Sequence, residues 1–202
     1  MHPQRHDEFR GAPGAWRGAV RGIRECVAQD MPVLMQMTAL PWNFHEIEDL
    51  AEFAHQEGVT GFTLYFLVCT GRGEELSDIT PSQYEEALVS LVKAQEAYPD
   101  MMVRARCAPQ ISRTASQQAS ALVGNAGCMA AKRYCRITPE GRLTPCPYMP
   151  LSAGSLREHS FADLWHDSPV MQGLRGSALK GKCGSCDFQE LCGGCRARAL
   201  AL

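Results

Sequence analysis

Seven of the ten cysteines lie between residues 128 and 195, and this concentration constrains the fold of the chain more than any other feature. They form two groups separated by 36 residues, with the spacings Cys-x6-Cys-x10-Cys and Cys-x2-Cys-x5-Cys-x2-Cys. Two Cys-x2-Cys knuckles so close together are typical of metal binding. The seven residues are Cys128, Cys135, Cys146, Cys183, Cys186, Cys192 and Cys195.

The rest of the sequence indicates a reducing compartment and no membrane. A content of 45% hydrophobic and 21% charged residues excludes disorder and collagen-like structure. The N-terminus has no apolar segment with a cleavage site behind it, so we expect no secretory signal. The longest apolar run, Phe62–Cys69, has eight residues, whereas a bilayer span needs about 20. We therefore expect a cytoplasmic protein whose cysteines stay reduced.

Charge is distributed unevenly along the chain. Residues 128–202 carry a net charge of +4, while the remaining residues carry −6. An iron-sulfur cube held by four thiolates has a net charge of about −2, so a basic surround suits it. A charge of +4 is too small to indicate nucleic-acid binding. We therefore expect no nucleic-acid partner.

Three kinds of cysteine chemistry compete for this region. A hairpin between Cys135 and Cys146 would place these two residues opposite each other, with Cβ atoms about 4.5–5.5 Å apart. They could then bind neighbouring irons or form a disulfide, which a reducing compartment disfavours. Zinc ribbons usually separate their knuckles by roughly 15–20 residues, whereas five residues separate these. Seven thiols also exceed one tetrahedral site. The sequence favours iron-sulfur clusters, with zinc as the alternative.

The first 107 residues alternate between helical and strand patterns. We expect helices over 14–29 and 43–57 and from Pro81 onward, and strands over 32–40, 61–68 and 101–107. Side chains that cap helix starts are expected at Asn43, Thr80 and Ser160. This order predicts βα units around a parallel sheet. Three strands make an incomplete sheet, so we expect the chain to be part of a larger protein.

A small, polar and aperiodic stretch, Ser112–Ala121, is expected to connect two domains. The boundary would lie near residue 120. The predicted domains are residues 1–120, with the α/β pattern, and residues 121–202, with the clustered cysteines.

The cysteine pattern resembles that of a known family. The spacing Cys-x12-Gly-x4-Cys that begins at Cys128, followed by the two knuckles and the ending GGCRARA, resembles the SPASM domain of radical SAM enzymes. The resemblance covers residues 128–199. It implies auxiliary [4Fe-4S] clusters, the first bound by Cys128, Cys135, Cys146 and Cys195, and a second bound by Cys183, Cys186 and Cys192. The second cluster would be incomplete or open at one iron.

Segments further upstream extend the resemblance to the radical SAM partial barrel. His6–Gly11 and Leu64–Gly73 are similar to its second half. The implied fold is α/β: the second half of a radical SAM partial (βα) barrel followed by a small cysteine-rich SPASM domain. Within it, Arg72 would contact the carboxylate of S-adenosylmethionine, although a simple turn at Thr70–Gly73 is the alternative. Cys26, Cys69 and Cys107 are expected to be apolar or incidental thiols and not ligands.

The expected function follows from two features: the group of radical SAM enzymes that the sequence most resembles, and a cysteine motif that it lacks. Tyr134–Met149 and the GGCRARA ending most resemble the enzymes that process siroheme-derived tetrapyrroles toward heme or heme d1, and peptide-modifying relatives share much of the pattern. The sequence lacks the Cys-x3-Cys-x2-Cys that binds the cluster that cleaves S-adenosylmethionine. We therefore expect a C-terminal fragment or split half of an oxidoreductase, inactive without an N-terminal radical SAM half. The alternative is a non-enzymatic iron-sulfur or zinc module that binds a substrate or partner.

Overall fold

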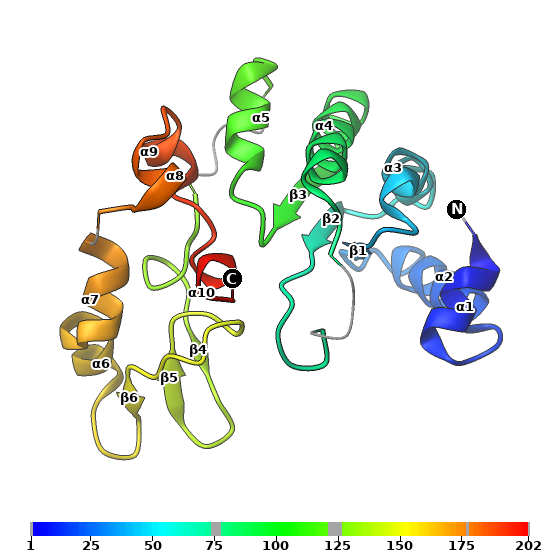
Figure 1. The fold of residues 1–202 in the computed structure, drawn as a ribbon. Coiled ribbons are helices and arrows are strands. Elements are labelled where there is room, and N and C mark those ends of the chain that lie inside the picture. The colour runs from blue at the N-terminus through cyan, green and yellow to red at the C-terminus, as the bar shows by residue number, and fades with distance from the viewer. Residues whose placement is uncertain (1, 74–77, 121–126, 177, 202) are drawn as a thin grey trace. The chain divides into compact units, whose positions relative to one another are not determined.

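The computed structural model describes residues 2–73, 78–120, 127–176 and 178–201 (Figure 1). The chain divides into two compact units. The first unit comprises residues 1–67 and 78–106, and the second comprises residues 68–77 and 107–202. The domain boundary near residue 120 stays a prediction.

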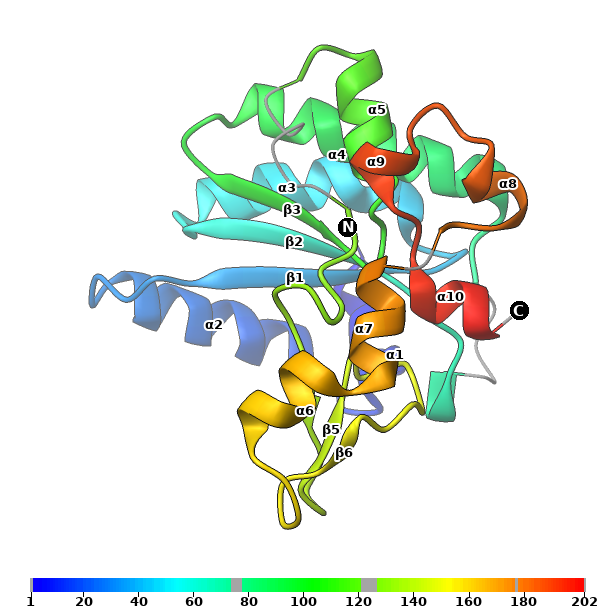
Figure 2. The same cartoon turned by 90° about the vertical axis from the view of Figure 1, so that its left-hand side faces the viewer.

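The first unit is built on a parallel three-stranded sheet, as the alternating pattern predicts. Its strands are β1 (Leu34–Ala39), β2 (Gly61–Phe66) and β3 (Met102–Arg106), in the order β1-β2-β3. Its helices are α1 (Pro3–Arg10), α2 (Ala15–Val27), α3 (Ile47–Gln56), which follows a 3-10 turn η1 (Phe44–Glu46), and α4 (Pro81–Ala97). Because parallel neighbours need long crossover connections, α3 and α4 join consecutive strands. Figure 2 shows both helices along one side of the sheet.

The two faces of the sheet differ in chemistry. On one face, Phe62, Leu64 and Phe66 are buried together with Leu88 and Leu91 of α4. The other face carries polar side chains in two rows that the strand register defines. These rows are Gln36, Thr63 and Arg104, and Thr38, Tyr65 and Arg106. Since neighbours in register point to the same face, one side of the sheet is a hydrophobic core and the other carries these polar side chains, of which Thr63 is buried.

Helix α4 begins and ends with side-chain hydrogen bonds. At its start the Thr80 hydroxyl accepts from the Gln83 N–H (3.3 Å) and the Gln83 side chain accepts from the Thr80 N–H (2.9 Å), which confirms the predicted cap. At its end the Gln95 amide donates to the carbonyls of Tyr98 and Met101 (3.3 and 3.1 Å) and accepts from the Val103 N–H (3.0 Å). Gln95 therefore fixes the turn from α4 into β3.

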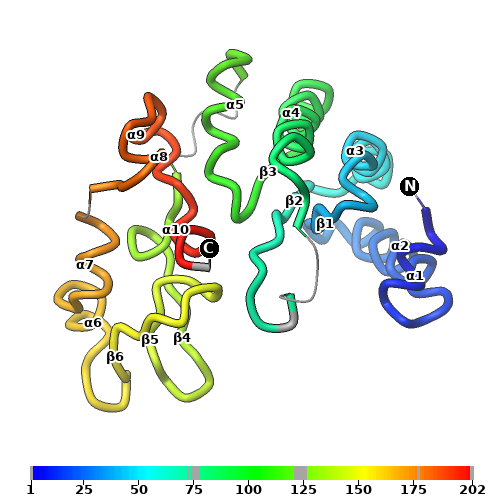
Figure 3. Tube along the Cα trace, in the orientation of Figure 1, coloured from blue at the N-terminus to red at the C-terminus, as the bar shows by residue number. Residues whose placement is uncertain are grey.

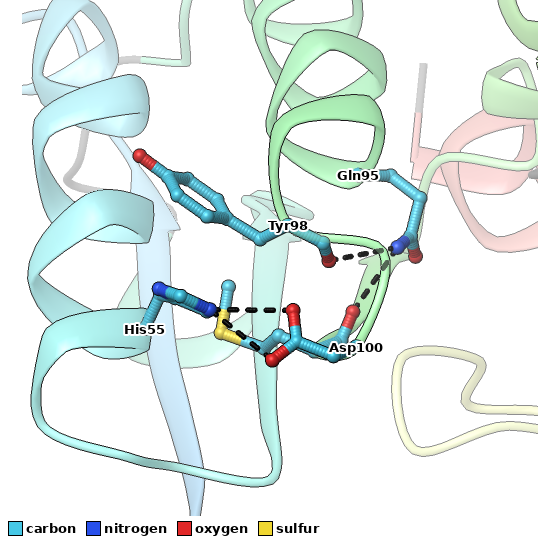
Figure 4. A network of polar contacts seen from close by, with 5 residues as sticks. His55, Gln95, Tyr98 and Asp100 are labelled. Carbon is cyan, nitrogen blue, oxygen red and sulfur yellow. Dashed lines mark hydrogen bonds and ion pairs between the residues drawn. The ribbon is translucent and has the colours of Figure 1, made fainter.

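Helix α3 is attached to the same turn through His55 (Figure 4). The His55 ring stacks on Tyr98 with centroids 4.6 Å apart. Its Nε2 lies 3.2 Å from both carboxylate oxygens of Asp100. The two helices on the apolar face of the sheet are thus held together at one end by polar contacts as well as by packing.

The predicted helix cap at Asn43 is wrong. Its side-chain oxygen accepts from the Leu40 N–H (2.7 Å), and its amide donates to the Thr38 carbonyl (3.0 Å). Asn43 is buried and closes the turn that follows β1. An asparagine side chain can form hydrogen bonds with the backbone of a turn as well as with the first N–H groups of a helix, and here it bonds to the turn.

The second unit starts with a helix where we expected a connector. Helix α5 spans Ile111–Gln117. Ser112, Thr114 and Ala115 are buried in it. Small side chains allow close packing without a stripe of large apolar residues, so the sequence pattern did not reveal this helix. Ala121, the end of the expected connector, lies outside the described residues.

The rest of the second unit combines a small antiparallel sheet with short helices (Figure 3). The strands are β4 (Arg136–Ile137), β5 (Arg142–Thr144) and β6 (Gly154–Ser155). The helices are α6 (Phe161–Asp167), α7 (Pro169–Gly176), α8 (Gly181–Gly184), α9 (Gln189–Cys192) and α10 (Arg196–Ala201). The Ser160 hydroxyl accepts from the Asp163 N–H (3.1 Å), which confirms the predicted cap of α6. No helix in the described part of the chain is long and apolar enough to cross a membrane.

The hairpin of β4 and β5 exists, but its expected register is wrong by one residue. Ile137 pairs with Leu143 and Arg136 with Thr144. Gly141 has a φ of +82°, which suits a three-residue loop with a left-handed residue before β5. Continuing this register places Cys135 opposite Pro145, one position before Cys146.

Candidate metal centre

Three thiols of the second unit gather around Cys195. Burial raises the pKa of the Cys195 thiol above its ordinary value, and the neighbouring Cys128 thiol raises it further. Burial also raises the pKa of Cys146, and the nearby thiols of Cys128 and Cys195 add to that effect. Mutual electrostatic influence of this kind requires that the three sulfur atoms lie close together. We call Cys128, Cys146 and Cys195 the first thiol group.

The thiols of Cys183, Cys186 and Cys192 form a second group. Burial raises the pKa of Cys192, and the neighbouring thiols of Cys183 and Cys186 raise it further. Cys183 is exposed, whereas the other two are half-buried. Cys192 and Cys195 are only three positions apart in the sequence, yet they belong to different groups.

Two glycines between Cys192 and Cys195 account for this separation. Gly193 and Gly194 both have left-handed backbones, with φ values of +65° and +63°. Few other residues adopt this conformation without strain. A Cβ atom at Gly194 would lie 3.4 Å from the Cys183 sulfur, so the glycine also leaves room for that thiol.

Backbone N–H groups point at four of these sulfur atoms. The Phe188 N–H donates to the Cys186 sulfur (3.4 Å). A backbone hydrogen bond from Tyr148 lowers the pKa of Cys146, and one from Gly194 lowers the pKa of Cys192. Two such bonds, from Ala197 and Arg198, lower the pKa of Cys195. All three effects oppose that of burial. Such bonds stabilise thiolates, which are the form that binds iron.

Each thiol group also has an arginine near it. Arg198 lowers the pKa of Cys195, and Arg113 of α5 lowers the pKa of Cys192, in each case against the larger effect of burial. Thiolate sulfur donors, aimed N–H groups, a glycine cradle and a nearby cation together fit an anionic iron-sulfur cluster in each group.

The structure places Cys135 elsewhere. It packs against a hydrophobic cluster that contains Leu143, Leu164 and Met171. Burial raises the pKa of Cys135, and no other thiol in the described part of the chain contributes to this shift. The side chain that the resemblance makes a ligand of the first cluster is therefore set apart from the first thiol group.

Cys107, which we did not expect to be a ligand, lies beside that group. Burial raises its pKa to about 12, and the thiols of Cys195 and Cys146 also raise it. It packs with them against Val68 and Met149. The one sequence signal was its position at the carboxyl end of the third predicted strand, because ligand sites collect at the carboxyl ends of parallel strands.

The other candidate residues differ in how far the structure describes them. The backbone of Arg72 lies in a 3-10 turn, η2 (Gly71–Gly73), but its side chain is outside the described part, so its role stays a prediction. His159 and His166 are exposed, as expected for solvated histidines. All ten cysteines are free thiols. Among the residues that the structure describes, no three cysteine, histidine or acidic side chains converge closely enough to hold a single metal ion.

Comparison with known families agrees with the thiol chemistry. Residues 128–196 match the SPASM family, described as an iron-sulfur cluster-binding domain. These residues are a SPASM domain. The match ends one residue after Cys195, so the SPASM domain contains both thiol groups, whereas Cys107 precedes it.

Relatives with curated names extend over nearly the whole chain. An AdoMet-dependent heme synthase of Methanosarcina barkeri is 34% identical over 97% of the chain, which covers 60% of that protein. A heme synthase of Nitratidesulfovibrio vulgaris is 32% identical, and a pre-heme d1 synthase of Dinoroseobacter shibae is 27% identical. They are covered over 57% and 55% of their lengths. The chain therefore spans little more than half of the curated relatives it matches.

The fold is also found in a solved structure. Streptococcus suis SuiB matches with a TM-score of 0.65 over 91% of this chain and 46% of SuiB, at 15% sequence identity. Other structures of SuiB contain S-adenosylmethionine or the precursor peptide SuiA. At this identity the likeness shows a shared fold and nothing about the ligands of this chain.

Proposed function

We propose that this chain is part of a radical SAM oxidoreductase and that its SPASM domain holds auxiliary [4Fe-4S] clusters. The observation that carries the proposal is the separation of Cys192 from Cys195 into different thiol groups. A zinc module built on two adjacent knuckles would use all four knuckle thiols for one ion. Two groups, each with N–H donors and an arginine, support two clusters instead.

The proposed ligands follow the two groups. Cys128, Cys146 and Cys195 bind the first cluster, and the family resemblance adds Cys135 as its fourth ligand. Cys183, Cys186 and Cys192 bind the second cluster, which leaves one iron without a cysteine from this set. When bound, such clusters accept and donate single electrons. The protein's part is to bury the thiolates and to direct N–H groups and arginines at them, which sets the potential at which electrons move.

The chain depends on a further segment for S-adenosylmethionine. The sequence has no Cys-x3-Cys-x2-Cys, so the cluster that would cleave S-adenosylmethionine needs thiols from another part of the enzyme. We propose that the parallel sheet is the second half of a partial barrel, that Arg72 contacts the cofactor there, and that the protein acts in the cytoplasm, where its thiols stay reduced.

A tetrapyrrole is the proposed substrate. The heme synthase and pre-heme d1 synthase relatives support this class. Siroheme-derived tetrapyrroles carry several carboxylates, and guanidinium groups can bind a carboxylate through two hydrogen bonds. Arg104 and Arg106 lie on the polar face of the sheet and could bind the substrate in this way. A ribosomal peptide is the second candidate, since a PqqA peptide cyclase of Granulibacter bethesdensis is 28% identical over 97% of the chain.

Anaerobic reconstitution with iron and sulfide tests the proposal. We expect about four or more irons and as many sulfides per chain, because the first thiol group supports a complete cubane. The variants Cys195→Ala and Cys192→Ala should each remove a different EPR signal, although the residues are near neighbours in sequence. Stoichiometric zinc without labile sulfide, or the loss of one common signal in both variants, would contradict two clusters.

A second assay tests the dependence on another segment. Supplied with a strong reductant and S-adenosylmethionine, the reconstituted chain alone should produce no 5′-deoxyadenosine above background. Sustained cleavage by highly purified protein would show that the reactive cluster lies within this chain.

A further inference from the structure

Cys107 lies in the second unit, beside the first thiol group. It directly follows β3, and its backbone is left-handed, with a φ of +60°. Its thiol is half-buried and, like Cys146 and Cys195, packs against the buried cluster of Val68, Met149 and Ala197. A cysteine in this backbone conformation is uncommon, and here it turns the chain from β3 toward α5.

The side chains around Cys107 are those that surround the first thiol group. Tyr148, whose N–H is directed at the Cys146 sulfur, also makes a side-chain hydrogen bond with the Cys107 thiol. Arg198, the cation beside Cys195, also acts on Cys107. Cys107 therefore shares its apolar packing, a hydrogen-bond donor and a cation with Cys146 and Cys195.

Cys135 shares none of these contacts among the described residues. Its apolar neighbours belong to another cluster, which contains Leu143 and Met171 and meets the first one through Leu174. The observed hairpin register also moves it one position away from Cys146. In a fully ligated cubane each of the four irons binds one thiolate, so the fourth cysteine must lie close to the other three. Cys107 meets this condition better than Cys135.

We infer that Cys107, in place of Cys135, is the fourth thiolate ligand of the first cluster. This inference rests on the proposed function and changes its ligand set. When iron binds, the Cys107 thiol transfers its proton to solvent and forms a sulfur–iron bond, with no change in oxidation state. The ligand precedes the SPASM domain in sequence, so it links the cluster covalently to the end of β3.

The test isolates the first cluster in the full-length chain. In a background with Cys183, Cys186 and Cys192 replaced by Ser, the chain should bind about four irons, all in the first cluster. Adding Cys107→Gly should lower the iron content and change the EPR signal to that of a cluster held by three cysteines, whereas adding Cys135→Ser should leave about four irons and the signal unchanged. Glycine is chosen for position 107 because it suits a φ of +60°, so backbone strain cannot explain the loss. Cys26→Ser, a half-buried thiol of α2, is the matched control.

A second readout protects the test against misfolding of the variants. In the otherwise unchanged chain, alkylation followed by mass spectrometry compares each cysteine before and after reconstitution. Cys107 should become protected when the cluster forms, while the reactivity of Cys135 should not change. Protection of Cys135 but not Cys107, or loss of iron in Cys135→Ser, would overturn the inference. Absence of iron and sulfide from the unchanged chain would instead contradict the proposed function itself.

Discussion

The two units use different means to reach a stable fold. In the first, β2 and α4 bury large apolar side chains such as Phe62, Leu64 and Leu91 without exposure. In the second, the short helices α8 and α9, which contain Cys183 and Cys192, have no buried residue. Burial of apolar area is the main stabilising contribution to a fold. The first unit therefore has a core of large apolar side chains, whereas the second has a smaller one around Leu143 and Met171. Under the proposed function, bound clusters add to the stability of the second unit.

Removal of the metal should affect the two units most differently. Chelation of reconstituted protein should abolish amide protection in the hairpin and in α8 to α10, and leave β1 to β3 protected. For scale, structural zinc contributes about 10–16 kcal/mol to zinc-finger peptides, where binding and folding are coupled. Hydrogen exchange with and without chelator measures this. Equal loss of protection in both units would show that the first unit lacks independent stability.

The converse experiment removes a side chain from the apolar core. Phe62 is fully buried, and Phe62→Ala should lower the free energy of unfolding by about 3–5 kcal/mol because it leaves a cavity. Urea denaturation followed by circular dichroism measures the loss. Gln36→Ala, at an exposed position of β1, is the control and should stay within about 0.5 kcal/mol. Iron content should not change at temperatures where Phe62→Ala is folded, and a drop would couple the two units.

A smaller effect is expected where polar contacts join helix and sheet. Gln95→Leu leaves the Val103 N–H and the carbonyls of Tyr98 and Met101 without the bonds that Gln95 makes. The free energy of unfolding should fall by about 1–3 kcal/mol. Gln56→Leu, which removes an exposed bond to Glu52, is the matched control. Equal stability of the two variants would show that the turn into β3 does not need its side-chain bonds.

The smallest effect concerns backbone conformation in the second unit. Gly194→Ala introduces strain of about 1–2 kcal/mol at a left-handed position, and its Cβ would approach the Cys183 sulfur to 3.4 Å. We expect partial loss of iron from the second cluster, measured by EPR. Gly181→Ala is the control, since Gly181 has a φ of +55° and no atom within 4 Å of a Cβ. Similar iron loss in both variants would mean that strain alone is responsible.

Elements with strong local signals could be predicted from the sequence. The three strands, the parallel sheet and the caps at Thr80 and Ser160 agree with the structure. In each case the deciding interaction lies within a few residues or follows from apolar periodicity. The predicted cap at Asn43 was wrong because an asparagine side chain can bond to the residues before it as well as to those after it, and Asn43 accepts from the Leu40 N–H. Helix α5 was missed because, apart from Ile111, its buried residues are small.

The order of residues is enough to show that this chain is rich in thiols suited to metal and that an α/β region precedes them. Which thiols meet depends on the folded structure. It separated Cys192 from Cys195 through two left-handed glycines, moved Cys135 by one position in the hairpin, and brought Cys107 to Cys146 across 39 residues of sequence. The physical reason is that spacing governs contacts between near neighbours, whereas contacts between distant residues depend on packing and register that no local pattern encodes.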